Sequence, residues 1–130
     1  MNNIIQKTHF LDSLRSFLYG LLEAGWQTFA FIVAIRYFQA DTNFKSLIAA
    51  AGPIGFLITP LSLYFFAGKK ILASSAASLI YFLTAAFLLA SVSVNSLFVF
   101  GSFVILSLII NVQKGPVLLD IYTTNYPPNQ

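Results

Sequence analysis

The sequence contains no cysteine and a single histidine, His9. Without cysteine the chain has no disulfide framework, no Cys-ligated zinc or iron–sulfur cluster and no thiol nucleophile, and its redox compartment stays undetermined. A lone histidine gives no basis for a metal site. Charge is also scarce, because Asp, Glu, Lys and Arg together make up 8% of the 130 residues. Soluble domains usually carry about 25% charged residues, so a water-soluble fold is not expected.

Hydrophobic residues make up 58% of the sequence, and the mean hydropathy is +0.81. The net charge of +3 comes from seven basic residues scattered between apolar runs, which is not the basic patch that binds nucleic acid. The sequence also has no Gly-rich phosphate loop, no His and carboxylate metal spacing and no nucleophile beside a base. We therefore predict no nucleic-acid partner, no cofactor and no enzyme activity.

Lys69 and Lys70 separate two uncharged apolar runs, residues 46–68 and 71–94. A bilayer core about 30 Å thick needs about 20 apolar residues at 1.5 Å rise each, and both runs meet that requirement. The sequence predicts an all-α polytopic membrane protein, with residues 1–15 as an amphipathic lead-in at the interface. Four transmembrane helices are expected at about 16–38, 46–67, 71–92 and 96–124.

Several helices carry features that affect their shape. Pro53 and Pro60 lie inside the second helix, where we expect kinks rather than breaks. Small residues at i,i+4 spacing in the third helix permit close helix approach: Ala73 with Ala77, and Ser74 with Ser78. The fourth helix either stops at 114–116, a Lys-Gly-Pro sequence, or kinks there and continues to about residue 124. Continuation is favoured because the following segment is apolar and has no turn signal.

The basic residues predict the orientation of the helices. Short cytoplasmic loops carry the excess of Lys and Arg. Four basic residues fall on the side of the 69–70 turn and two on the other: Lys7, Arg15, Lys69 and Lys70 against Arg36 and Lys45. Both ends of the chain are therefore expected in the cytoplasm, and the protein in the plasma (inner) membrane.

Small and polar residues recur on one face of the first predicted helix: Ser16, Gly20, Glu23, Gln27, Ala30 and Ala34. A carboxylate at the centre of a membrane helix costs about 2.5–3.5 kcal/mol, so Glu23 is expected to face protein or a water-filled cavity. Glu23 and Gln27 are candidates for a substrate or proton pathway. The alternative is structural, because Glu23 lies only about 10 Å from the cytoplasmic end and can reach interfacial water.

The fourth helix has a matching polar face, formed by Ser107, Asn111 and Lys114 at i, i+4 and i+7. Lys114 is expected at a depth close to that of Glu23, so the two side chains can pair across facing helices. We predict that the pair lines a cavity and senses protons or substrate, with a snorkelling lysine as the alternative. Trp26 either stacks on a ligand or fills a helix interface.

The turn after the second helix ends with Gly68, Lys69 and Lys70, and Asp120 lies near the end of the fourth helix. This layout resembles the first four helices of a major facilitator superfamily transporter. Members carry Gly-x-x-x-Asp-Arg-x-Gly and two basic residues in this turn. The end of the motif matches, whereas hydrophobic residues occupy its Gly, Asp and Arg positions: Leu61, Phe65 and Phe66. Residues 126–128, Tyr-Pro-Pro, look like the turn that follows the fourth helix in the family.

The resemblance implies the amino-terminal part of a secondary transporter that moves a small solute by alternating access, with proton coupling left open. It implies that the first and fourth helices line the cavity, that Asp120 contacts the basic turn, and that the partners are the bilayer, the solute and further helices of the same transporter. Four helices correspond to one three-helix repeat plus the start of the next. The alternatives are a complete four-helix anchor or regulatory subunit and a small dimeric exporter.

Overall fold

The computed structural model describes residues 2–68 and 71–125. These ranges contain no strand and form α1 (Asn2–Arg36), α2 (Thr42–Gly68), α3 (Ala73–Val92), α4 (Leu97–Val112) and α5 (Lys114–Asn125). Four stretches are long and apolar enough to cross a membrane: Gln6–Arg36, Thr42–Phe66, Ala73–Val92 and Leu97–Thr124. The predicted all-α fold with four helices able to span a membrane is confirmed.

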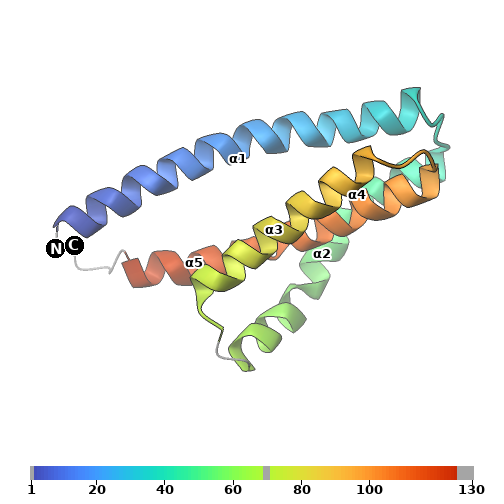
Figure 1. The fold of residues 1–130 in the computed structure, drawn as a ribbon. Coiled ribbons are helices and arrows are strands. Elements are labelled where there is room, and N and C mark those ends of the chain that lie inside the picture. Colours follow the sequence, from blue (N-terminus) through green and yellow to red (C-terminus); the bar gives the residue numbers. More distant parts are fainter. Residues whose placement is uncertain (1, 69–70, 126–130) are drawn as a thin grey trace.

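The helices form an elongated bundle in which α4 lies between α2 and α3, and α5 continues beside α3. Figure 1 shows α1 running along one side of this group, in the direction opposite to α4 and α5. The start of α1 and the end of α5 lie at one end of the bundle, which we call the terminal end. The loops at 37–41 and 93–96 lie at the other end, which we call the loop end.

The first helix differs from its prediction at its start. No helix boundary falls near residue 16, because the expected lead-in is the first part of the 35-residue helix α1. Neither proline nor glycine interrupts residues 2–15, and an i,i+3 ion pair between Arg15 and Asp12 at 2.7 Å supports the helix there. The expected position of this segment at the membrane interface stays a prediction.

The second helix begins four residues before its predicted start, at Thr42. The reason is a cap, since the backbone N–H of Phe44 donates to the Asp41 carboxylate at 2.8 Å. The helix then passes through Pro53 and Pro60 without a break, as predicted. Its second half bends away from the first in Figure 1.

The fourth predicted helix continues past Lys114, as expected, with a joint at Gln113 between α4 and α5. Pro116 lacks the N–H that would bond the carbonyl of Val112, which explains the interruption. The Gln113 amide holds the joint against α2, because Nε2 donates to the carbonyls of Gly55 at 2.8 Å and Ile109 at 3.0 Å, and Ser62 donates to Oε1 at 2.6 Å. Side chains and neighbouring helices commonly satisfy backbone groups in this way in membrane proteins.

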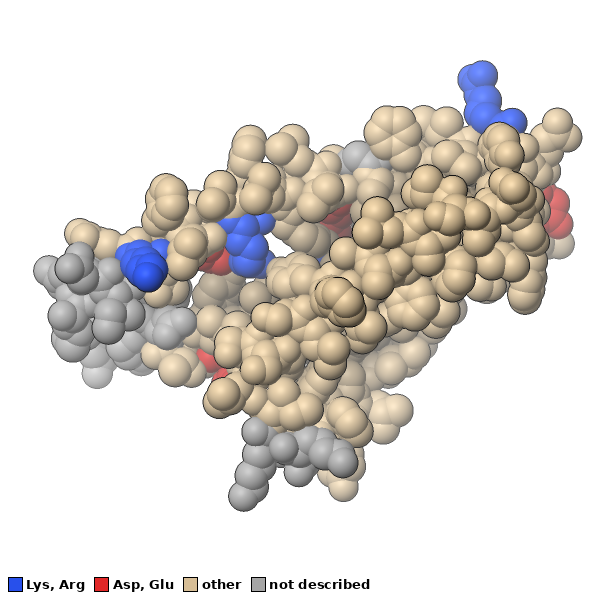
Figure 2. All heavy atoms as spheres, in the orientation of Figure 1, with Lys and Arg blue, Asp and Glu red and all other residues tan. Residues whose placement is uncertain are grey.

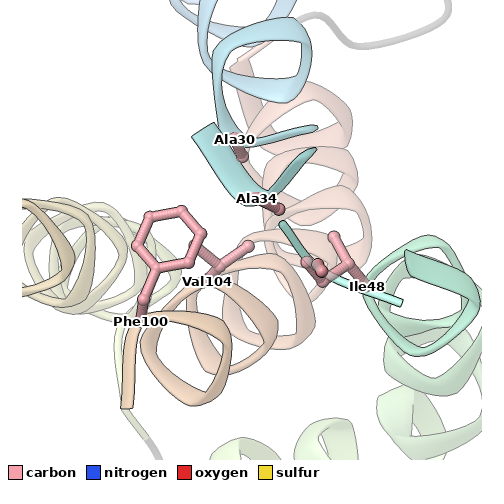
Figure 3. Close-up of a cluster of buried hydrophobic side chains, with 6 residues drawn as sticks. Ala30, Ala34, Ile48, Phe100 and Val104 are labelled. Atoms are coloured by element: carbon pink, nitrogen blue, oxygen red, sulfur yellow. The ribbon is translucent and has the colours of Figure 1, made fainter. Parts of the chain in front are cut away.

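Two clusters of buried apolar side chains hold the bundle together. At the loop end, α1 packs on α2 and α4 through side chains that Figure 3 shows converging: Ala30, Ala34, Ile48, Phe100 and Val104. The second cluster joins α3 to α5 through Ala76, Ala77, Ile80 and Val117, with Ala73 packed against it. Ala73 and Ala77 therefore lie at a helix contact as expected, whereas the other predicted pair, Ser74 and Ser78, is exposed.

A glycine to alanine change tests the packing of α2 on α4. A Cβ atom added at Gly101 lies 2.0 Å from Cζ of Phe44, so the Phe44 ring must move. Such overpacking usually costs about 1–3 kcal/mol. We expect Gly101→Ala to lower the unfolding temperature in detergent micelles.

The matched control is Gly20→Ala, because a Cβ at Gly20 meets nothing within 4 Å. This variant should unfold at the unchanged temperature or slightly above it, since alanine favours helix over glycine. Equal unfolding temperatures for the two variants would contradict the packing described here.

Candidate functional site

The side of α1 that faces α4 and α5 carries the polar residues of the bundle. Helix α1 runs antiparallel to α4 and α5, so residues early in α1 contact residues late in α5. From the loop end to the terminal end, the paired levels are Ala30 with Val104, Tyr19 with Asn111, and Arg15 with Tyr122. We call this strip of contacts the seam. It is apolar at the loop end and polar toward the terminal end.

Tyr19, Glu23, Asn111 and Lys114 form the middle level of the seam, which we call the polar cluster. The Asn111 side chain donates from Nδ2 to the Tyr19 hydroxyl at 2.8 Å and accepts at Oδ1 from the Lys114 ammonium at 3.2 Å. Nζ of Lys114 lies 3.3 Å from the centre of the Tyr19 ring, a cation–π contact. Glu23 hydrogen-bonds the Tyr19 hydroxyl and attracts Lys114.

The polar cluster unites three of the residues selected from the sequence, Glu23, Asn111 and Lys114. Lys114 is half-buried and held by Asn111 and the Tyr19 ring rather than extended toward the interface. Tyr19 was missed, although it lies one helical turn before Glu23 and so shares its face. An aromatic residue near a membrane interface looks like an anchor in sequence, which hides the role of its hydroxyl.

The predicted small and polar face of α1 is partly wrong. Ala30 and Ala34 are buried against α4, as the face requires, but Ser16 and Gly20 are exposed. Glu23 belongs to the predicted face and does interact with the other helices. Larger residues that were not part of that face continue it: Asp12, Arg15, Tyr19 and Trp26. Where α1 lies farther from the other helices, only long side chains can reach them. Small residues therefore face the seam only where the helix backbones are close, at Ala30 and Ala34.

A second polar group closes the terminal end of the seam, and we call it the Arg15 clasp. Arg15 of α1 donates to the hydroxyl of Tyr81 on α3 at 2.8 Å and to the hydroxyl of Tyr122 on α5. Tyr122 in turn donates to the Asp12 carboxylate at 2.7 Å. The Tyr81 ring also meets the Tyr19 ring edge-on, with centroids 6.4 Å apart, so the clasp adjoins the polar cluster.

Cavities flank the seam on both sides of the polar cluster. An apolar cavity of about 440 Å³ lies toward the loop end between α1 and the helices α3 and α4, and Trp26, Phe29 and Val33 line its α1 side. A second cavity of about 520 Å³ lies at the terminal end and includes Asp12 and Arg15 in its wall. Figure 2 shows charged atoms beside a hollow between α1 and the rest of the bundle.

The remaining candidates from the sequence lie outside the polar cluster. Trp26 packs on the loop-end cluster and lines the apolar cavity, so both of its proposed roles stay open. Gln27 lies in α1, but its side chain is outside the described residues, as are Lys69 and Lys70. Gly68 is the last residue of α2, and Asp120 is exposed. The predicted contact of Asp120 with the basic turn therefore stays a prediction.

Among the described residues, no group of three or more His, Asp or Glu side chains lies close enough to hold a metal ion. The chemistry that the polar cluster offers is hydrogen bonding and charge from one carboxyl group, one ammonium group and one amide, at a single level of helices that are long and apolar enough to span a membrane. This arrangement is able to bind a polar solute or to carry a proton.

A scan against protein-family models and searches of curated proteins and of solved structures found no match. The resemblance to the major facilitator superfamily accordingly rests on the helix layout and on the turn and tail residues named above.

Removal of one hydroxyl tests the polar cluster. Tyr19→Phe keeps the ring beneath Lys114 but leaves Nδ2 of Asn111, which is buried, without its acceptor. Hydrogen bonds between membrane helices are worth about 0.6 kcal/mol on average and up to about 1.7 kcal/mol. We expect a loss of unfolding free energy within that range, measured by denaturant titration in mixed micelles.

Tyr64→Phe on α2 is the control, because the Tyr64 side chain is 79% exposed. This change should leave the free energy of unfolding unaltered. A loss as large as that of Tyr19→Phe would show that the hydroxyl of Tyr19 is not engaged in the seam.

Proposed function

We propose that this chain forms the first four helices of a secondary active transporter of major facilitator type, which moves a small solute across the membrane by alternating access. The observation that carries the proposal is the polar cluster, because it brings Glu23, Asn111 and Lys114 together between α1 and α4–α5 within segments able to span a membrane. Ionisable groups at such depths are costly and usually mark substrate or ion pathways.

Each side chain of the cluster has a role in this proposal. The Glu23 carboxyl group takes up the coupling proton or binds a donor group of the solute, and the Lys114 ammonium neutralises it when it is charged. Asn111 orients both, since it bonds Lys114 and Tyr19 at once. The apolar cavity lined by Trp26 leaves space for the less polar part of a solute beside the cluster.

Both chain ends are placed on the cytoplasmic side of the plasma (inner) membrane by the positive-inside rule. Further spanning helices are expected in the native gene product, as the resemblance implies. A membrane anchor or regulatory subunit, the alternative function, needs no charged groups between its helices, and for that reason the polar cluster favours transport.

Water access to the seam separates these functions. The natural chain has no cysteine, so Ser107→Cys introduces a single, nearly isosteric thiol. Ser107 is fully buried on α4, one turn before Asn111 on the face toward α1. In a transporter, water in the transport pathway would reach this position. Thiols react as thiolates, and a thiolate forms only in a polar environment, so the reaction of a thiol at position 107 reports the presence of water. We expect Ser107→Cys in proteoliposomes to react with a small, charged methanethiosulfonate reagent.

Ser102→Cys on the same helix provides a stringent control. Ser102 is partly exposed on the outside of the bundle and lies about 7.5 Å closer to the loop end than Ser107. If depth alone governed the reaction, Ser102→Cys would react faster; if a pathway exists, Ser107→Cys should react about tenfold faster or more. An unreactive Ser107→Cys would favour the anchor and overturn the transport proposal.

A further inference from the structure

The two ends of α1 are attached to the bundle by different kinds of contact. At the loop end, Ala30 and Ala34 pack into an apolar cluster, and Ala34 has 0% of its surface exposed. Toward the terminal end, none of the described side chains of α1 before Ala30 is buried. From Asp12 to Glu23 the helix is joined to the rest by polar contacts, and a cavity of about 520 Å³ lies beside Asp12 and Arg15.

We propose that the Arg15 clasp is a releasable latch, and that α1 swings away from α3 and α5 about its alanine contact when the latch opens. The latch controls access to the polar cluster from the terminal end. Its part in transport rests on the proposed function, whereas the movement of α1 does not.

The distribution of charge in the clasp permits release. The ion pair between Arg15 and Asp12 joins two residues of the same helix, so it stays intact when α1 moves. Within the clasp, the contacts that break are those with the hydroxyls of Tyr81 and Tyr122, and the same movement separates Tyr19 from Asn111. The Arg15 and Asp12 side chains are 29% and 31% exposed, so water can replace the two hydroxyls without leaving either charge unpaired.

The position of the clasp links it to the polar cluster. Tyr81 contacts both Arg15 and the ring of Tyr19. Tyr19 in turn accepts a hydrogen bond from Asn111, and its ring contacts the Lys114 ammonium. Separation of α1 from α3 therefore removes two contacts of Tyr81 together: its ring contact with Tyr19 and its hydrogen bond with Arg15. The terminal cavity beside Arg15, about 520 Å³ in volume, then becomes continuous with the level of the polar cluster.

A double substitution, Tyr81→Phe with Tyr122→Phe, tests the latch, because it removes both hydroxyls and keeps both rings. The readout is the distance between two spin labels in lipid nanodiscs, measured by double electron–electron resonance. One label pair spans the terminal end, at Phe10→Cys and Leu119→Cys, and both positions are exposed. A second pair spans the loop end, at Ile35→Cys and Phe98→Cys, which are also exposed.

The lever from Ala30 to Phe10 is 20 residues, or about 30 Å, so a swing of about 10° moves Phe10 by about 5 Å. We expect the double substitution to lengthen the terminal-end distance by several ångströms and to leave the loop-end distance unchanged. Tyr64→Phe, with its hydroxyl on the exposed face of α2, should change neither distance.

An unchanged terminal-end distance would overturn the latch. A change at both ends would overturn it as well, because the tyrosines would then stabilise the whole bundle rather than one end of α1. If the terminal-end distance increases while Ser107→Cys remains unreactive in the same variant, the latch stands and the proposed transport pathway fails.

Discussion

A hydrogen bond between two segments able to span a membrane, from Asn111 to the Tyr19 hydroxyl, sets the level at which α1 meets α4. A hydrocarbon environment offers no water to polar side chains, so an amide on one helix must find its partner on another. Asn111 is buried and the Lys114 ammonium depends on it in turn. Once this level is set, the antiparallel course of α1 brings Ala30 to Val104 and Arg15 to Tyr122.

The joint at Gln113 makes this arrangement possible. Because the helix is interrupted between α4 and α5, Lys114 and Tyr122 are carried by α5, which packs on α3, while Asn111 belongs to α4, which packs on α2 as well. The Gln113 amide ties the joint to the Gly55 carbonyl of α2. The polar cluster is thus assembled where three packed helices already constrain the backbone, and α1 supplies the fourth side through long side chains.

The sequence predicted the apolar spans, the unbroken passage through Pro53 and Pro60, and the continuation beyond Lys114, because length and hydropathy decide these features. It also predicted that Glu23 and Lys114 can pair across facing helices and that Asn111 shares the face of Lys114. It did not predict the Arg15 clasp, since Arg15 was assigned to the cytoplasmic end by its charge alone. Periodicity locates a face on one helix, but which tyrosine reaches that face from another helix depends on packing that no local pattern records.

The seam, the polar cluster and the latch all depend on the register of α1 against α4 and α5, and crosslinking in the native membrane measures that register directly. In the cysteine-free chain, paired thiols at positions 19 and 111 should be joined by a short bifunctional thiol reagent, because the native side chains touch. Thiols at positions 19 and 104 should not, since residue 104 lies about two turns away along α4. Crosslinking of the second pair and not the first would contradict the seam, and with it the polar cluster and the latch.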